Sequence, residues 1–292
     1  MRAVQHFVQD QLILPLRTLP RVQTLREGSM FDTGHMVTAG ETALFVSQAG
    51  KSDGPPIVLL HGGLGSRADF VPLAKHLIQQ YRLITIDSRG HGRSGLGQVK
   101  MTYRQLADDV AAVLKELGLN EAGLIGHSDG GIVALRLAAA PGVVRPRFVV
   151  AVAAHWVLPD DDPIREVYQG VTVEEWREMF SEQIERYEAE NPEPDFARLF
   201  EATKSMWLGR DADAYPGETV RAIKVPLLVV HGDEDFLVSR RQAFDLAERV
   251  EGARLLNLPF ASHTLLEDRP NETLPALTDF ISGVSEGEQA QS

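Results

Sequence analysis

Continuous apolar runs alternate along this chain with stretches in which apolar residues recur every three or four positions. The continuous runs predict strands at 42–48, 56–60, 82–87, 122–126, 148–153, 226–230 and 254–258. The periodic stretches predict helices at 66–80, 102–118, 129–140, 239–250 and 272–283. Strands that are apolar throughout are typical of parallel sheets buried on both sides. The pattern therefore predicts an α/β fold, a mainly parallel sheet with helices on both faces.

The alternation is interrupted once, between residues 157 and 221. This stretch contains no apolar run that predicts a strand. Two helical patterns occupy it, one from Thr172 to Asn191 and one from about Pro194 to Leu208. We expect a helical cap, residues 157–221, inserted between two strands of the sheet.

This interruption predicts a division of the chain into four parts. The α/β core would comprise residues 34–156 and 222–284, and the cap residues 157–221. Residues 1–33 match no clear pattern, so we expect an arm of unknown role, and residues 285–292 form a polar tail.

Composition and charge narrow the possible partners. The chain of 292 residues has no cysteine, which excludes disulfides, cysteine nucleophiles and thiolate metal ligands. Its formal net charge of −12 gives no general attraction for nucleic acid or for anionic membranes. The sequence shows neither a long apolar run that would span a membrane nor a signal-peptide pattern. We expect a cytoplasmic protein without nucleic-acid or membrane partners, and the oligomeric state is left open.

The first chemical motif is Gly126-His127-Ser128-Asp129-Gly130, which fits the pattern G-x-S-x-G. It falls between a predicted strand and a predicted helix, the context of a nucleophile elbow, in which a strained turn exposes the serine. The flanking glycines let strand and helix pass closely, and the helix amides face the reaction centre. The motif predicts Ser128 as a nucleophile, and the alternative is a glycine-rich turn with a surface serine.

A serine nucleophile needs a base, and the base needs a carboxylate that orients it. Of nine histidines, His263 alone follows the last predicted strand, and Asp235 follows the strand before it. The chain order Ser128, Asp235, His263 is the order expected when both partners come after later strands. Asp233 lies close to Asp235, and Asp160 to Asp162 follow the strand before the cap, so either is an alternative acid.

The strand at 56–60 runs into a second glycine-rich turn, His61-Gly62-Gly63-Leu64-Gly65. Backbone amides in such a turn can bind an oxyanion together with the amide that follows the nucleophile. We expect Gly63, or alternatively Leu64, to supply the first amide and Asp129 the second; the other interpretation is a plain tight turn. The residues expected around the substrate pocket are Leu64, His127, Trp156 and Phe236.

Two further features allow more than one interpretation. Asp129 places a carboxylate next to the nucleophile, where it could stabilise the start of a helix or pair with a cationic substrate. Several histidines follow predicted strands, but they lack the pairing of a metal-binding motif, so we expect neither a metal nor another cofactor. These histidines are His61, His91, His127, His155, His231 and His263.

Together, these motifs resemble those of the α/β-hydrolase superfamily, in its cap-bearing branch. The matching segments are His61-Gly62-Gly63, Asp87 to Ser94, Gly126 to Gly131, Gly232-x-x-Asp235-x-x-Val238 and a late histidine. The resemblance covers about residues 37–283. It implies an eight-stranded sheet, a Ser-Asp-His triad and an Asp87–Ser94 loop that supports the elbow without taking part in chemistry. The serine is unlike the nucleophilic aspartate of the related epoxide hydrolases and haloalkane dehalogenases, which argues against those activities.

These observations predict a serine hydrolase that cleaves a small carboxylic ester, thioester or lactone. Ser128 would be acylated, and water activated by His263 would release the acid without a cofactor. Two alternatives are a ligand-binding receptor on a hydrolase scaffold and a cofactor-free perhydrolase or acyltransferase, because the same fold hosts many functions.

Overall fold

The computed structural model describes residues 30–140, 142 and 144–289. An eight-stranded sheet runs through its centre in the order β1-β2-β4-β3-β5-β6-β7-β8. Strand β2 pairs antiparallel with β1 and β4, and all other neighbours in the sheet are parallel. This sheet confirms the predicted fold class. The strands are β1 (Gly34–Ala39), β2 (Thr42–Gly50), β3 (Pro56–Leu60), β4 (Arg82–Ile86), β5 (Glu121–His127), β6 (Arg145–Val152), β7 (Leu227–Gly232) and β8 (Arg254–Leu258).

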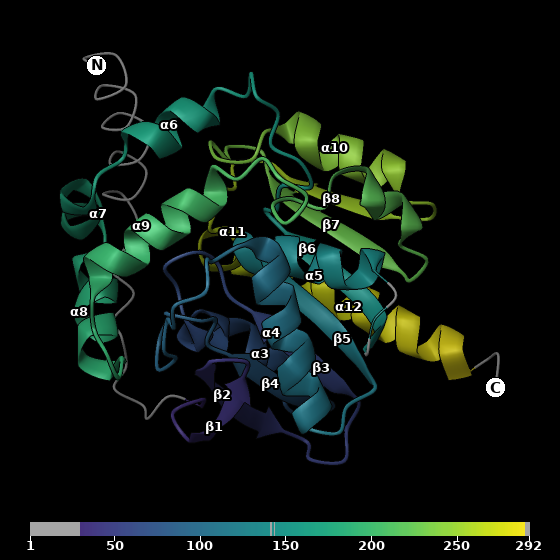
Figure 1. The fold of residues 1–292 in the computed structure, drawn as a ribbon. Helices are drawn as coiled ribbons and strands as arrows, with labels where there is room; N and C mark the ends of the chain where they lie inside the picture. The colour runs from purple at the N-terminus through teal and green to yellow at the C-terminus, as the bar shows by residue number, and fades with distance from the viewer. Residues whose placement is uncertain (1–29, 141, 143, 290–292) are drawn as a thin grey trace.

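Helices cover both faces of the sheet. One face packs against α4 (Tyr103–Glu116), α5 (Asp129–Ala139) and α10 (Arg240–Arg249). In Figure 1, α4 and α5 lie in front of the strands and α10 is seen above β8. The other face packs against α3 (Val71–Leu77), α11 (Leu265–Asp268) and α12 (Pro270–Gln289). Two short 3₁₀ helices, η2 (Arg67–Phe70) and η3 (Gly217–Ala222), complete the connections around the sheet.

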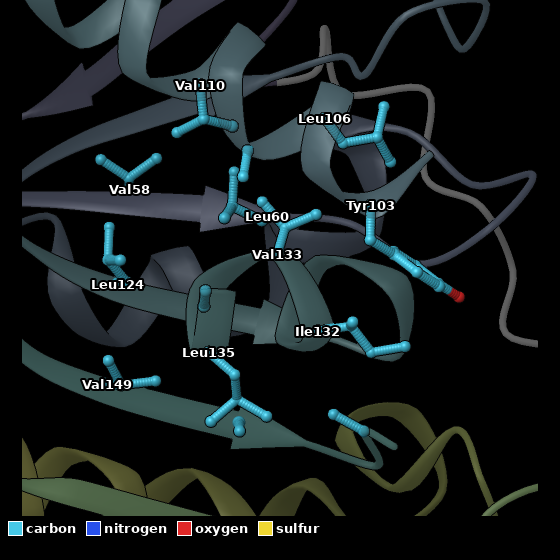
Figure 2. Packing of buried hydrophobic residues seen from close by; sticks show 14 of the residues in the cluster. Val58, Leu60, Tyr103, Leu106, Val110, Leu124, Ile132, Val133, Leu135 and Val149 are labelled. Atoms are coloured by element: carbon cyan, nitrogen blue, oxygen red, sulfur yellow. The ribbon is translucent and has the colours of Figure 1, made fainter. Parts of the chain in front are cut away.

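Side chains of the central strands alternate between these two layers. In β3, Val58 and Leu60 pack toward α4 and α5, as Figure 2 shows, whereas Ile57 and Leu59 pack in the cluster under α3 and α12. The alternation follows from the two-residue period of a strand. Because both faces are covered, both sets of side chains are apolar, which explains the continuous apolar runs in the sequence.

The cap segment lies between β6 and β7 and carries four helices. They are grouped on one side of the molecule, away from the end of α12 (Figure 1). A small apolar cluster of Val171, Ile184, Phe196 and Phe200 holds them together. The helices are α6 (Ile164–Gly170), α7 (Val173–Met179), α8 (Ser181–Glu190) and α9 (Phe196–Trp207).

Several elements differ from the predicted ones. Strand β1 was not predicted, because most of its side chains are exposed and leave no apolar run. The predicted helix 66–80 is divided into η2 and α3, which has Pro72 in its first turn. The helix predicted from Thr172 divides at Phe180, and α6 was not predicted. Helix α12 continues through Gln289 into the predicted polar tail. Most of the predicted arm, residues 1–29, lies outside the described residues.

Candidate active site

The carboxyl ends of the parallel strands meet at one edge of the sheet. Among the described residues, the non-glycine residues in the left-handed backbone region all lie just beyond this edge, after β3, β5, β6 and β8. They are Leu64 (φ +60°), Ser128 (φ +49°), Ala153 (φ +49°) and Phe260 (φ +59°). Such a conformation costs about 1–3 kcal/mol and is concentrated at functional sites, so this edge is the candidate active site.

Ser128 occupies a tight turn between β5 and α5. Its N–H donates to the carbonyl of Val152 at 2.8 Å, which ties the turn to the end of β6. A Cβ at Gly126 would collide with the carbonyl of Gly130, and a Cβ at Gly130 would collide with the carbonyl of Leu60. The absence of side chains at these two positions therefore lets strand and helix cross closely enough to expose the serine at the tip of the turn.

The structure brings Ser128, His263 and Asp235 together. His263 Nε2 lies 3.0 Å from Ser128 Oγ, and His263 Nδ1 lies 2.9 Å from Asp235 Oδ2. Because a carboxylate only accepts hydrogen bonds, Nδ1–H donates to Asp235, and Nε2 is free to accept the serine proton. The other carboxylate oxygen accepts the backbone N–H groups of Leu237 and Val238 at 2.9 and 3.0 Å, which fixes the orientation of Asp235.

Asp235 and His263 each stabilise the charged form of the other. Burial by itself would raise the pKa of Asp235, but His263 and the Val238 N–H outweigh it, so the pKa of Asp235 is lowered. Burial would likewise lower the pKa of His263, but the facing Asp235 carboxylate raises it above its ordinary value of 6.5. The pair therefore favours a charged His263, the state that a base reaches after accepting a proton.

The alternative acids make other contacts. Asp233 pairs with Arg240 and accepts a hydrogen bond from Asn257. Asp160 pairs with Arg210 at 2.7 Å, and Asp162 accepts the backbone N–H of Ile164 at the start of α6. Of the acids weighed from the sequence, Asp235 is the one that the structure places against His263.

His127, which was predicted in the substrate pocket, packs against the backbone of His263. Its Nε2–H donates to the His263 carbonyl at 2.9 Å, and its ring lies 5.1 Å from the His263 ring between centroids. Burial, together with the neighbouring His263, lowers the pKa of His127 to about 4. His127 is therefore neutral at pH 7 and holds the loop that carries His263.

The carboxylate of Asp129 is buried and bonded from two sides. The Tyr103 hydroxyl, at the start of α4, donates to Oδ1 at 2.6 Å, and the Trp207 indole N–H, at the end of α9, lies 2.9 Å from Oδ2. Burial raises the pKa of Asp129 above its ordinary value, although these two donors counteract it. Sequence reasoning missed both partners; the only signal was the position of Trp207 on the apolar face of a cap helix.

The remaining predicted pocket residues are buried to different extents. Trp156 is buried after β6, and the guanidinium of Arg249 lies 4.2 Å from its ring centroid. Phe236 is half-buried in the loop that carries Asp235. Leu64, also half-buried, packs against the apolar cluster of the cap.

The loop from Asp87 to Ser94 is held by structural hydrogen bonds. The Asp87 carboxylate binds the Arg67 guanidinium at 2.7 Å, and the Ser94 hydroxyl donates to the Asp87 carbonyl at 2.6 Å. His61 Nε2 accepts the backbone N–H of Ser88 at 2.9 Å, which joins this loop to the turn after β3. These contacts fit the supporting role that the resemblance implies.

The described residues contain neither a metal-binding cluster nor a membrane-spanning helix. No cluster of histidine and carboxylate side chains in the described ranges has the arrangement needed to hold a metal ion. Across residues 30–140, 142 and 144–289, no helix combines the length and the apolar character needed to cross a membrane.

The eight-stranded sheet, with a serine at the tight turn between β5 and α5, is that of an α/β hydrolase. Residues 57–276 match the family model described as Alpha/beta hydrolase family, and the chain belongs to that family. It is therefore an enzyme, a hydrolase, and its relatives include an sn-1-specific diacylglycerol lipase and a bifunctional esterase/perhydrolase.

The chain is similar to two curated proteins over different lengths. It is 29% identical to the human (Homo sapiens) serine hydrolase BPHL over 276 residues, 87% of this chain and 91% of that protein. It is 40% identical to the sn-1-specific diacylglycerol lipase ABHD11 of Danio rerio over 103 residues, 35% of this chain and 32% of that protein. The second match thus spans about a third of the relative.

Among solved structures, the enol-lactonase from Burkholderia xenovorans LB400 superposes with a TM-score of 0.68. The alignment covers 85% of this chain and 100% of the lactonase at 22% sequence identity. At this identity the likeness shows the shared fold alone.

Proposed function

We propose that the chain is a serine hydrolase that cleaves a small carboxylic ester, thioester or lactone through an acyl-enzyme on Ser128. The observation that carries the proposal is the unbroken hydrogen-bond chain from Asp235 through His263 to Ser128. The names of the relatives, a serine hydrolase and a lipase, support an ester-type substrate.

In this mechanism Ser128 Oγ attacks the carbonyl carbon while His263 Nε2 takes its proton. The backbone amides of Gly63 and Asp129 donate to the oxyanion, and the protonated His263 returns the proton to the leaving alcohol. Water, deprotonated by His263, then attacks the acyl group; the acyl–Oγ bond breaks, and His263 returns the proton to Ser128 Oγ as the acid is released. Asp235 holds the imidazole in the required tautomer and stabilises its positive charge. Residues 157–221 act as a cap over a core of residues 34–156 and 222–284.

A fluorophosphonate label tests the nucleophile. Peptide mapping by mass spectrometry is expected to place the adduct on Ser128, because an activated serine displaces the fluoride of the probe and becomes phosphonylated. Ser128→Ala is expected to abolish labelling and to lower kcat on p-nitrophenyl esters by ~10⁴–10⁶-fold. The control Ser262→Ala, next to His263 in the chain, is expected to keep the labelling and the kcat of the wild type. An adduct on Ser94 or Ser262 in the wild type would contradict the assignment.

Turnover number separates the alternatives. A hydrolase processes many equivalents of a p-nitrophenyl ester, whereas a receptor on this scaffold would stop after a few. A perhydrolase would form peracid from the ester and hydrogen peroxide faster than it hydrolyses the ester.

A further inference from the structure

The turn after β3, His61 to Gly65, is held on one side by the core. His61 Nε2 accepts the Ser88 N–H, and the Gly65 N–H closes the turn on the Gly62 carbonyl at 3.2 Å. These bonds fix the two ends of the turn. The apex, Gly63 and Leu64, is where the proposed oxyanion amide lies.

The apex is held from the other side by the cap. A Cβ at Gly63 would lie 2.5 Å from Asp129 Oδ2 and 2.8 Å from Trp207 Cζ2, so the Asp129 carboxylate and the cap indole both cover this glycine. The Trp207 N–H also bonds both oxygens of that carboxylate, at 3.1 and 2.9 Å. The end of α9 is therefore in direct contact with the turn and with the residue that follows the nucleophile.

Leu64 provides a second contact with the cap. Its side chain packs against the cluster of Val171, Ile184, Phe196 and Phe200, and also against the larger apolar cluster, to which Trp207 belongs. Its backbone is left-handed at φ +60°, which a leucine adopts only when surrounding contacts impose it. Apolar packing of the side chain into the cap supplies such a contact.

We propose that the cap holds the oxyanion turn in its working conformation, with Trp207 and Leu64 as positioning residues. The inference rests on the proposed function and deepens it: the Gly63 amide faces the reacting carbonyl only while the cap packs on the turn. Cap closure over a substrate and oxyanion stabilisation would then be one event, and a displaced cap would leave Ser128 without its full catalytic environment.

The test compares Trp207→Phe with the matched control Trp176→Phe. Both are cap tryptophans with ring centroids 5.9 Å apart, but Trp207 is the one that donates to Asp129. The substrates are p-nitrophenyl acetate and its thiono analogue, in which sulfur replaces the carbonyl oxygen. Sulfur is the weaker hydrogen-bond acceptor, so the ratio of kcat/KM between the two esters reports on the amide donors.

Trp207→Phe is expected to lower kcat on the oxygen ester by about 10–100-fold, less than the ~10²–10³-fold of a deleted oxyanion donor. KM should stay within about twofold, and the oxygen-to-sulfur ratio should fall. Trp176→Phe should leave the ratio unchanged. A rise in KM alone, or an unchanged ratio in Trp207→Phe, overturns the inference, because the cap would then act on binding only.

Leu64 variants keep the test decisive if Trp207→Phe folds poorly. Leu64→Ala removes the apolar packing of this side chain and is expected to lower kcat and the oxygen-to-sulfur ratio. Leu64→Met conserves volume and is expected to restore the ratio toward the wild-type value. Wild-type ratios in Leu64→Ala overturn the inference. The proposed function fails separately: wild-type protein that takes no fluorophosphonate label on Ser128 contradicts the mechanism itself.

Discussion

His263 is constrained at three points, each from a different part of the chain. Asp235 accepts from Nδ1, Ser128 Oγ lies at Nε2, and His127 donates to the backbone carbonyl of His263. Side chain and backbone are therefore both oriented before a substrate arrives, which lowers the cost of reaching the transition state. The Asp235 carboxylate also raises the pKa of His263, so the same contact both orients the ring and stabilises its positive charge.

The pair of loop aspartates gives a matched test at this scale. Asp235→Asn is expected to lower kcat by ~10⁴-fold, because an amide neither stabilises the imidazolium nor selects its tautomer. Asp233→Asn should retain most activity, since Asp233 pairs with Arg240 and Asn257. Steady-state kinetics of both variants on one ester would check this. The opposite ranking would make Asp233 the orienting acid.

The pH profile is expected to follow from the pKa of His263. A base must be neutral, so kcat/KM should rise with pH through a midpoint above the ordinary value of 6.5. In Asp235→Asn the burial of His263 remains while the carboxylate is lost, so the midpoint should move to lower pH. An unchanged midpoint in that variant would show that Asp235 does not set the pKa.

Among the elements, α8 and α9 meet the core at a polar anchor. Asn191, between these helices, donates through Nδ2 to the carbonyls of Gly90, Gly92 and Ser94, at 3.3, 2.9 and 3.1 Å. The preceding Glu190 binds the buried Arg67 at 2.6 Å. The cap is therefore attached to the loop that supports the elbow as well as to the turn after β3.

Asn191→Ala is expected to destabilise the protein by about 1–3 kcal/mol, because it leaves buried carbonyl groups without a donor. Urea unfolding would measure the loss, and limited proteolysis should show earlier cleavage within the cap. Gln183→Ala, at an exposed position of α8, serves as the control and should stay within ~0.5 kcal/mol of the wild type. Equal stability of the two variants would show that the anchor contributes nothing.

Elements and motif residues differ in how far the sequence predicts them. Ser128, Asp235 and His263 each follow an apolar strand closely, and parallel strands bring their carboxyl ends to one edge, so their meeting could be expected. Strand β1 left no signal because its side chains are largely exposed. The bond from Trp207 to Asp129 joins residues 78 positions apart through the placement of the cap, which no local pattern encodes.

At the scale of the whole molecule, charge is distributed unevenly. The formal net charge is −12, and the cap segment alone contains 17 acidic and 7 basic residues. The buried Asp129 adds a carboxylate beside Ser128. Distant surface charges are screened beyond a Debye length of about 8 Å at physiological ionic strength, whereas a buried group is screened much less.

Matched esters of equal size would separate these two contributions. Neutral and amine-bearing esters are expected to have higher kcat/KM than an ester with a free carboxylate, because the acidic cap and the Asp129 carboxylate both repel an anion. High salt should reduce the difference in kcat/KM between these esters to the extent that surface charges of the cap cause it. Asp129→Asn should reduce the difference that remains at high salt. A wild-type preference for the anionic ester would leave Asp129 with no role in recognition.

The four left-handed residues beyond the strand ends also affect the thermal stability of the protein. Leu64, Ser128, Ala153 and Phe260 each store strain that glycine would relieve, at about 1–3 kcal/mol per site. Glycine also enlarges the conformational ensemble of the unfolded chain, which costs about 0.4–1 kcal/mol of stability. A modest net gain is therefore expected at Phe260, whose side chain is 70% exposed, and not at Ala153, whose methyl group is buried in the core. A more thermostable variant can therefore be sought with Phe260→Gly. At Leu64, any stability gained with glycine would be accompanied by a lower kcat, because glycine would remove the packing of this side chain against the cap.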